Sequence, residues 1–561
     1  MEQNRLLNNK SIILLLIFII VSVCGFASTC VFENQTNISE VLLDKYNKVT
    51  TDPNVIWSVL SYVEIDSIVQ SENLILSLDN ETISVELIYS KVNGDEYYMH
   101  FSSENKEADV FLSILDHQIY GDIMSSSGSY LLQSISTHDI VISKYEINMN
   151  EDIDSYEEDI SDIGNENPIA TISSTPTIRV LFLYTNEVIS NMGLTPYATL
   201  KQTVYLNINQ ANESFYNSNV NANLQLAYIG PTNYDETSFS WDVVLSHFSN
   251  ANDGYIDEVH TLRNKYAADI CVLLIHKNGL CGKAKVINAT ASTAFCLADP
   301  KYSCNTKFTP IHEIGHLVGC RHDRLVDNTN TPYQYGHGYV HYTGVSSSSW
   351  RTMMAYDSAC VSSACKRILY WSNPSIYYEG YATGTTTYEN NARVWNERAG
   401  TVAAFRNEAA QIAYTSANNN TTALFESIIA TSLITTSGGF EVQSGQTIDM
   451  VAPAIQLKSG THIKNGAIFR ATTQSNSNLY YGTTPISTDT IGGNLYNNKH
   501  REAANISDNK RQINIYSIDG KLLQQCLNCE LSSISLPNGV YIIRAIAEDG
   551  TIYQSKILIQ K

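Results

Sequence analysis

The chain has 561 residues, which at ~150 residues per domain predicts three to four folded units. Its 56 acidic and 35 basic residues give a net charge of −21, which argues against nucleic acid or an anionic membrane surface as the main partner. A hydrophobic content of 43% excludes a largely disordered chain, and eleven cysteines are too few for a small scaffold held by disulfides.

The negative charge is concentrated in one part of the chain. From Ser28 to Ala170 the sequence holds 27 acidic and 5 basic residues, a net charge of −22. The rest holds 29 acidic and 30 basic residues and is close to neutral. This change in composition predicts a domain boundary near residue 170.

The N-terminus has the pattern of a cleavable signal peptide over residues 1–27. Basic Arg5 and Lys10 precede an apolar run, Ser11–Val23, and Ala27 supplies a small residue for cleavage. The run is shorter than the ~20 residues of a membrane span, so we expect no transmembrane anchor. The protein is therefore predicted to be secreted or held at the cell surface, where cysteines can pair.

Residues 28–170 are predicted to be β-rich. Apolar and polar residues alternate in short runs such as Ile83–Tyr89, and glycines separate these runs. The final part, Glu151–Asn167, is acidic and poor in apolar residues, which is typical of a linker.

Residues 176–408 are predicted to form a layered α/β domain. Apolar runs at Ile178–Tyr184 and Ile270–Ile275 indicate buried strands. Helical spacing of apolar residues alternates with them, which favours helices packed on a sheet. The expected helices are Tyr197–Phe215, Ile256–Lys265 and Ala399–Glu408.

The remaining chain is predicted to be β-rich without a long repeat. A linker and a small β module fall within 409–475, with strand-like runs at Ala454–Leu457 and Ala467–Ala471. A polar linker at 476–510 separates this module from a final β-patterned domain at 511–561.

The segment from His312 to His322 contains the pattern H-E-x-x-H-x-x-G-x-x-H. His312 and His316 are four residues apart and so share one helix face, with Glu313 beside them. Gly319 can take a positive φ, which lets the chain leave the helix and bring back His322 as a third ligand. Three imidazoles leave the fourth position of a tetrahedral zinc ion open, as in catalytic sites.

This pattern is highly specific. Five fixed positions are expected by chance on the order of 10⁻⁵ times in a chain of this length. A helix that carries these histidines for purely structural reasons is therefore a poor explanation. We expect one catalytic zinc ion, which lowers the pKa of bound water to ~7, and Glu313 as the base that accepts the proton.

The chain resembles the metzincin metalloendopeptidases of the reprolysin-like branch, and within them the bacterial peptidyl-Asp metalloendopeptidases. The resemblance runs from about Ile178 to Arg406. It rests on the zinc motif and on these flanking segments: Ile178–Tyr184, Gly319–Asp323, Gly336–Tyr339, Tyr370–Pro374 and Asn391–Arg393.

The resemblance implies roles for residues near the zinc motif. Met354 takes the position of the family's methionine turn beneath the metal, and Asp323 that of a supporting aspartate. Tyr356 matches a tyrosine that some metzincins place near zinc, where it binds metal or steadies the oxyanion. Lys366 and Arg367 follow the turn, where the family's pocket for the residue after the scissile bond lies, and would favour acidic side chains there.

The resemblance also assigns roles to the two ends of the chain. Residues 28–170 take the place of a propeptide, and Cys30 is its single cysteine, so control of zinc by a cysteine is a weak option. The last ~50 residues resemble the C-terminal sorting domain of the type IX secretion system, whose machinery becomes an expected partner. The fold class is then α+β: a metzincin-like α/β catalytic domain with a zinc helix and methionine turn, a β-rich propeptide before it and small β modules after it.

Seven cysteines fall in the central region. Cys271 lies in an apolar strand and is expected to be unpaired, which leaves fifteen ways to pair the other six. A disulfide from Cys320 to Cys360 or Cys365 is a guess among these.

The predicted function is that of a secreted zinc endopeptidase made as a zymogen, with proteins or peptides as substrates. The alternative is a surface binding or adhesion protein with a structural zinc site, although such a site needs no base such as Glu313. We further predict that the acidic run Glu151–Asp162 is a substrate of the enzyme itself, because its tether keeps it close to an acid-selective site. The natural substrate, calcium dependence and oligomeric state stay open.

Overall fold

The computed structural model divides the chain into two compact units, up to Pro485 and from Ile486 onward, and each is described by itself. The structure describes residues 29–35, 38–52, 54–93, 96–146, 155–156, 175–345, 348–360, 365–406, 411–414, 424–436, 439–473, 512–517, 522–527, 539–546 and 552–559. The expected signal peptide and most of both expected linkers lie outside these residues. No helix among the described residues is long and apolar enough to span a membrane.

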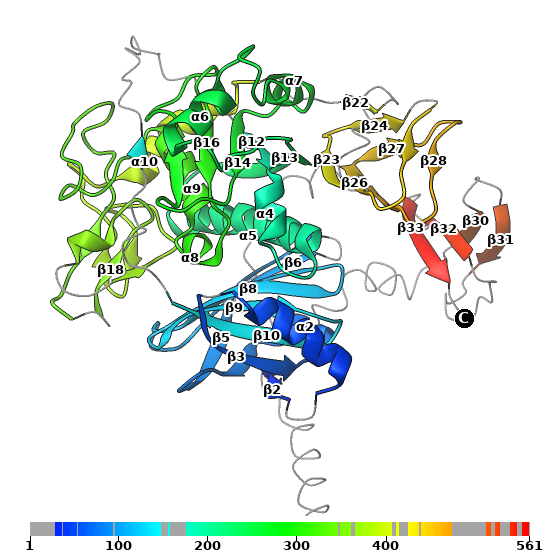
Figure 1. Cartoon of the computed structure of the whole chain (residues 1–561), viewed down its shortest axis with the longest axis horizontal. Coiled ribbons are helices and arrows are strands. Elements are labelled where there is room, and N and C mark those ends of the chain that lie inside the picture. The colour runs from blue at the N-terminus through cyan, green and yellow to red at the C-terminus, as the bar shows by residue number, and fades with distance from the viewer. Residues whose placement is uncertain are drawn as a thin grey trace, which may run out of the picture. The chain divides into compact units, whose positions relative to one another are not determined.

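The N-terminal region (29–145) forms one ten-stranded sheet, named here the N-terminal sheet, as expected for a β-rich segment (Figure 1). Strands β4 to β10 follow one another as antiparallel neighbours, and Asp116 and His117 take positive φ in the tight turn between β7 and β8. The helices are α2 (Glu40–Thr50) and α3 (Ile65–Val69). The strands are β1 (Thr29–Val31), β2 (Glu33–Asn34), β3 (Val55–Tyr62), β4 (Asn73–Ser77), β5 (Thr82–Asn93), β6 (Glu96–Ser102), β7 (Asp109–Leu115), β8 (Gln118–Ser125), β9 (Gly128–Ser134) and β10 (Asp139–Tyr145).

The central domain (175–406) is built on a mainly parallel sheet with helices on both faces, which confirms the expected mixed α/β architecture. The strands that the domain gives to this sheet are β12 (Thr177–Tyr184), β13 (Asn223–Pro231), β14 (Ile270–Leu274), β15 (Gly282–Ala284) and β16 (Phe295–Ala298). Two small sheets lie outside it: β17 (Val340–His341), β18 (Trp350–Arg351) and β19 (Lys366–Arg367) form one, and β20 (Tyr377–Tyr378) and β21 (Tyr381–Ala382) the other. Its helices are α4 (Asn186–Ser190), α5 (Pro196–Asn217), α6 (Trp241–Ser249), α7 (Glu258–Lys265), α8 (Tyr302–Asn305), α9 (Thr309–Val318) and α10 (Asn391–Val402).

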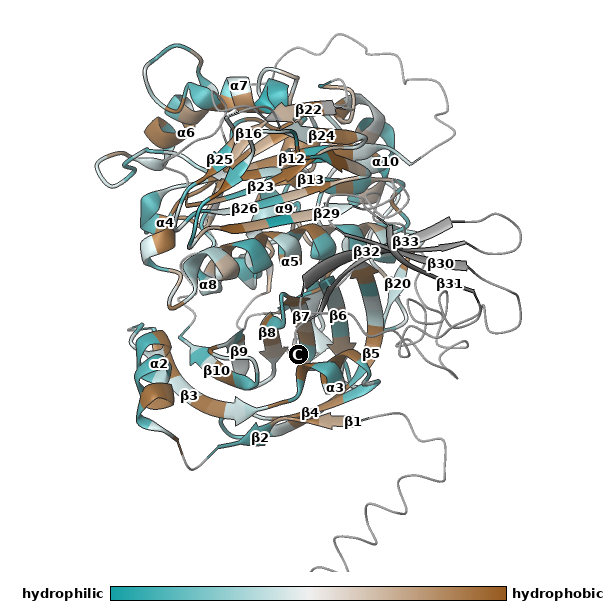
Figure 2. Ribbon diagram, turned by 90° about the vertical axis from the view of Figure 1, so that its right-hand side faces the viewer, coloured by the Kyte–Doolittle hydropathy of each residue, from teal (hydrophilic) through white to brown (hydrophobic). Residues whose placement is uncertain are grey.

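Alternation along β12 sends side chains into two separate cores. Val180 and Phe182 pack with residues of α5, α9 and α10, whereas Leu181 and Leu183 pack with α6 and α7. Helix α5 therefore runs beneath the central sheet, and its other side faces β7 and β8 of the N-terminal sheet (Figure 2).

Most predicted elements of the central domain are confirmed, with one clear error. The expected strands correspond to β12 and β14, and the first two expected helices to α5 and α7. The helix expected at 399–408 is instead α10, because the Asn390 side chain accepts a hydrogen bond from the Arg393 backbone and starts the helix earlier.

The segment 411–473 winds into a short coil of parallel strands, here called the solenoid, a short structural repeat that the sequence analysis did not predict. Ile434 pairs with Ile455 and Ile448 with Phe469, each 21 positions apart. Turn glycines recur at the same interval, and the sequences of the coils otherwise differ, which hides the period. The strands are β22 (Gln411–Tyr414), β23 (Phe425–Ile429), β24 (Leu433–Thr436), β25 (Glu441–Val442), β26 (Thr447–Ala452), β27 (Ala454–Gln456), β28 (His462–Ile463) and β29 (Ile468–Thr473).

The solenoid is continuous with the central sheet. Strand β23 pairs antiparallel with β13, so β23, β26 and β29 extend that sheet to nine strands. Ile434, Ile448 and Met450 belong to the same buried cluster as Leu181 of β12. What the sequence predicted as a separate β module thus shares a core with the central domain.

The second unit contains four antiparallel strands in the order β31-β30-β32-β33. They are β30 (Gln512–Ser517), β31 (Leu522–Leu527), β32 (Gly539–Ile546) and β33 (Ile552–Ile559), which agrees with the β pattern of the sequence.

Candidate metal centre and peptide-binding edge

Helix α9 presents the two histidines of the motif on one buried face. It starts after Phe308, which has a φ of 57°, and ends at Gly319, whose φ of 126° lets the chain leave the helix. A Cβ at Gly319 would also lie 2.9 Å from the Tyr333 ring. Both the conformation and the close ring therefore require glycine here, and the chain then returns to place His322 beside His312 and His316.

Three imidazole nitrogens converge in this fold. His322 Nε2 lies 3.2 Å from His312 Nε2 and 2.9 Å from His316 Nε2. The Nδ1 atoms of His312 and His316 face the carbonyl oxygens of Met353 and Cys320 at 3.0 and 2.9 Å. A carbonyl oxygen only accepts, so Nδ1 carries the proton and Nε2 directs its lone pair at the shared point. Converging imidazole lone pairs in a buried site fit one zinc ion.

His337 holds the loop that carries His322, and the sequence analysis missed this residue. Its Nδ1 lies 2.8 Å from the carbonyl oxygen of His322, and its Nε2 lies 2.9 Å from that of Thr329. Burial lowers the pKa of His337. The only signal in the sequence was its place in a segment that resembles the family.

Glu313 lies between the zinc helix and the edge of the central sheet. Its side chain is fully buried, and a Cβ at Gly282 of β15 would lie 2.4 Å from Glu313 Oε1. Glycine at position 282 therefore makes room for the carboxylate. Strand β15 thus borders the site directly.

A short strand from the chain's own acidic linker pairs with the outer side of β15. In β11 (Ser155–Tyr156), Ser155 pairs with Lys283 and Tyr156 with Ala284 in parallel register. The outer side of β15 therefore accepts an extended peptide, as sheet edges do in strand addition.

The turn beneath the histidines is fixed by large side chains against Gly315. A Cβ at Gly315 would lie 2.8 Å from the Trp371 ring and 2.9 Å from Met354 Sδ. Both side chains are fully buried. Met354 therefore lies against the middle of α9, between the turns that carry His312 and His316.

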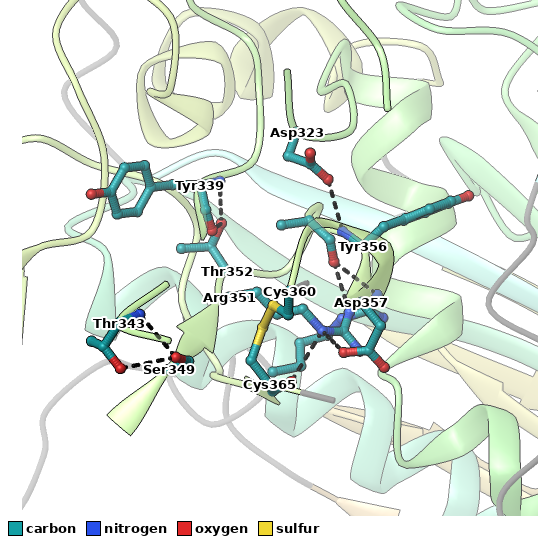
Figure 3. Close-up of a disulfide and its surroundings, with 12 residues drawn as sticks. Asp323, Tyr339, Thr343, Ser349, Arg351, Thr352, Tyr356, Asp357, Cys360 and Cys365 are labelled. Carbon is teal, nitrogen blue, oxygen red and sulfur yellow. Dashed lines mark hydrogen bonds and ion pairs between the residues drawn. A yellow bond between two sulfur atoms is a disulfide. The ribbon is translucent and has the colours of Figure 1, made fainter. Parts of the chain in front are cut away.

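Tyr356, which follows this turn, and Asp323, which follows the third histidine, are joined by a hydrogen bond (Figure 3). The Tyr356 backbone N–H donates to Asp323 Oδ2 at 2.9 Å, and the Tyr356 ring centre lies 4.3 Å from that of His322. Burial raises the pKa of Asp323. The resemblance named both residues as neighbours of the histidines and gave no partner for Asp323.

The region of the chain that holds this site is similar to known metallopeptidases. The model of metallo-peptidase family M12 matches residues 174–372. The peptidyl-Asp metalloendopeptidase of Pseudomonas fragi is 34% identical over 197 residues, which is all of that protein and 35% of this chain. The chain belongs to the M12 metallopeptidases.

Longer relatives are matched over part of their length. Peptidyl-Asp metalloendopeptidases of Stenotrophomonas maltophilia and Xanthomonas campestris are 44% and 41% identical over 237 and 239 residues, 42% of this chain. The chain spans about half the length of these relatives, 54% in each case.

The two cations suggested for the substrate pocket of this metallopeptidase have different surroundings. Arg367 is buried, and its guanidinium donates to the carbonyl oxygens of Lys307 and Ala355 at 2.5 and 3.1 Å. Arg351 donates to the same Ala355 oxygen at 2.7 Å. Lys366 Nζ instead lies 2.5 Å from Asp109 Oδ2 of the N-terminal sheet.

The disulfide guess for Cys320 was wrong. The metallopeptidase contains the pairs Cys281–Cys304 and Cys360–Cys365, with Cα atoms 5.2 and 6.0 Å apart. Cys320 is a buried thiol at the end of α9, because its side chain points into the core beside Asn391. The described unpaired thiols are Cys30, Cys271, Cys296 and Cys320, so Cys271 is unpaired as expected.

Cys30 offers no ligand to the histidine site. It is buried in the core of the N-terminal sheet, and burial raises its pKa to about 11. The thiolate needed for metal binding is therefore disfavoured.

Proposed function

We propose that this chain is a zinc endopeptidase that hydrolyses peptide bonds in extended protein segments. The observation that carries the proposal is the convergence of His312, His316 and His322 Nε2 atoms beside a buried glutamate. These histidines would hold zinc, which supplies Lewis acidity and an acidified water when bound.

The chain's own groups account for the remaining parts of such a reaction. Glu313 would accept the proton of the attacking water and pass it to the leaving amine. Strand β15 holds the substrate backbone in extended form, since it already pairs with β11. Tyr356, whose ring lies beside that of His322, would donate a hydrogen bond to the developing oxyanion.

We further propose a preference for acidic residues after the scissile bond. Arg351 and Arg367 place two guanidinium groups at the Ala355 carbonyl, a region that would attract a carboxylate. Relatives named peptidyl-Asp metalloendopeptidases support this substrate class. Because Arg367 already donates to two carbonyls, we assign it to the bottom of the proposed pocket for the acidic side chain. We assign Lys366 to the outer part of the same pocket.

We also propose roles for the segments before and after the central domain. Residues 1–27 would direct export, 28–170 would act as a propeptide, and 511–561 would serve sorting by the type IX machinery, giving a secreted or surface enzyme. The metallopeptidase would comprise 176–408, and the solenoid would be its permanent extension.

A cleavage profile on a whole-proteome peptide library tests the proposal. Wild type should cut before Asp or Glu at least fivefold more often than before neutral residues, since a charge-assisted hydrogen bond supplies ~1–3 kcal/mol. Glu313→Ala should lose turnover, and Arg367→Ala should lose only the acidic preference. Casein hydrolysis that survives Glu313→Ala would overturn the enzyme proposal and favour a binding protein with structural zinc.

A further inference from the structure

The N-terminal sheet meets the metallopeptidase through a buried row of alternating charges. His100 Nδ1 of β6 lies 2.6 Å from Glu213 Oε1 of α5, and His100 Nε2 lies 3.4 Å from Asp109 Oδ1 of β7. Asp109 Oδ2 in turn lies 2.5 Å from Lys366 Nζ of β19 (Lys366–Arg367). The row Glu213–His100–Asp109–Lys366 crosses from one domain to the other twice and is neutral only when His100 is protonated.

The geometry around His100 requires a proton on both ring nitrogens. Each nitrogen faces a carboxylate, which only accepts, so a neutral imidazole would leave one contact repulsive. The ring also stacks on Phe111 at 4.0 Å, and Phe111 contacts Phe308 at the start of α9. Burial alone would lower the pKa of His100, but Glu213 and Asp109 outweigh it and raise this pKa to about 9.

A second group on the same face of the N-terminal sheet also binds a proton more tightly in the docked state. Asp122 of β8 is fully buried, and its Oδ2 accepts a hydrogen bond from Asn305 of α8 at 3.0 Å. Burial raises the pKa of Asp122 to about 7 despite this bond. Neighbouring phenols have pKa values raised by burial and stay neutral: Tyr89, Tyr98, Tyr370 and Tyr378.

We propose that the N-terminal sheet is a separable, proton-linked ligand of the metallopeptidase: once the acidic linker is cut, it stays docked in mildly acidic solution and dissociates as the pH rises. Docking takes up protons at His100 and Asp122, since both hold a proton more tightly in the complex than in water. Raising the pH therefore removes attraction from the charge row and adds a buried negative charge at Asp122. Release also uncovers Lys366, which Asp109 covers in the docked state.

The experiment measures binding, so it does not depend on the proposed peptidase activity. In full-length Glu313→Ala, a recognition sequence for an unrelated protease is placed within residues 160–170, and the purified chain is cut there. The dissociation constant of the two fragments is then measured from pH 6 to pH 8.5. The His100 and Asp122 shifts predict an increase of at least tenfold over this range.

Matched variants separate the charge row from general effects. His100→Gln should weaken binding at pH 6 and reduce the pH dependence at least threefold, and Glu213→Gln should do the same from the metallopeptidase side. Asp122→Asn should remove much of the remaining dependence. His138→Gln is the control, because His138 is 47% exposed and pairs with Glu64 within the N-terminal sheet.

Several outcomes would overturn the proposal. One is separation of the two fragments at pH 6 as soon as the linker is cut. Another is a dissociation constant that changes by less than twofold between pH 6 and pH 8.5. Full pH dependence in a folded Glu213→Gln or His100→Gln variant would do so too, as would an equal effect of His138→Gln. Thermal melting of each variant shows whether it is folded.

Discussion

Two β-rich regions flank the metallopeptidase, and they are attached in different ways. The solenoid contributes Ile428, Ile434 and Phe440 to the core of the central sheet and joins it through the β13–β23 pairing. The N-terminal sheet has a core of its own, and its other face meets the central domain through ion pairs, amide hydrogen bonds, tyrosines and a few apolar side chains such as Phe111 and Leu131. A cavity of about 540 Å³ lies in this second contact, and residues of both regions line it, among them Tyr145 and Tyr302.

The difference indicates which region can leave. Separating the solenoid would expose aliphatic side chains to water at ~25 cal/mol per Å², whereas charges and phenols at the other contact regain hydration. The N-terminal sheet, proposed above as a propeptide, has more of the second kind of surface. The solenoid, proposed above as a permanent extension, shares a core with the central domain.

The largest expected effect is on folding. Deleting the solenoid by ending the chain after Arg406 should leave the metallopeptidase unable to fold, because its second core loses one wall. Cutting the linker near residue 165 in Glu313→Ala should leave it folded. Far-ultraviolet circular dichroism and thermal melting distinguish these results, and a folded chain ending at Arg406 would contradict the comparison.

A single core substitution should give a smaller effect with the same origin. Ile448→Ala in β26 removes a fully buried side chain and should lower the free energy of unfolding by ~2–5 kcal/mol. Ile468→Ala in β29 is the matched control, since Ile468 is 49% exposed and should cost less than ~1 kcal/mol. Denaturant unfolding followed by tryptophan fluorescence measures both. Equal costs would mean that the solenoid is not part of the core.

The smallest effect concerns docking of the N-terminal sheet in acid. Lys366 and His100 outweigh burial and hold the pKa of Asp109 below its usual range. A carboxyl with a lowered pKa stabilises the docked state above its ordinary pKa of ~3.9, and this contribution is lost as the pH falls below it. In the Asp122→Asn chain, which lacks the opposing effect of the Asp122 carboxyl, the cut protein should therefore bind its N-terminal fragment more weakly at pH 3 than at pH 5. Asp109→Asn should flatten this difference, whereas Asp139→Asn, at an ordinary position in β10, should retain it.

The sequence could predict what depends on short spacings. His312, His316 and His322 come together because a helical turn and one glycine bring them there, and β12, α5 and β14 follow from local periodicity. His337 and Gly282 were not predictable, since their roles depend on contacts between distant segments. Lys366 illustrates the same limit: its charge indicated an acidic partner, but only the fold shows that Asp109 is the one that it meets.

The 21-residue period of the solenoid has a consequence for how such enzymes can vary in length. Its last described strand, β29, has an open edge of the same kind that β23 offers to β26. One further coil inserted after Thr473 would add about 4.8 Å of stacked strand while leaving every residue around the histidines in place. Natural gain or loss of coils could therefore set the distance between the metal centre and whatever follows it in the chain, as a spacer whose length is independent of catalysis.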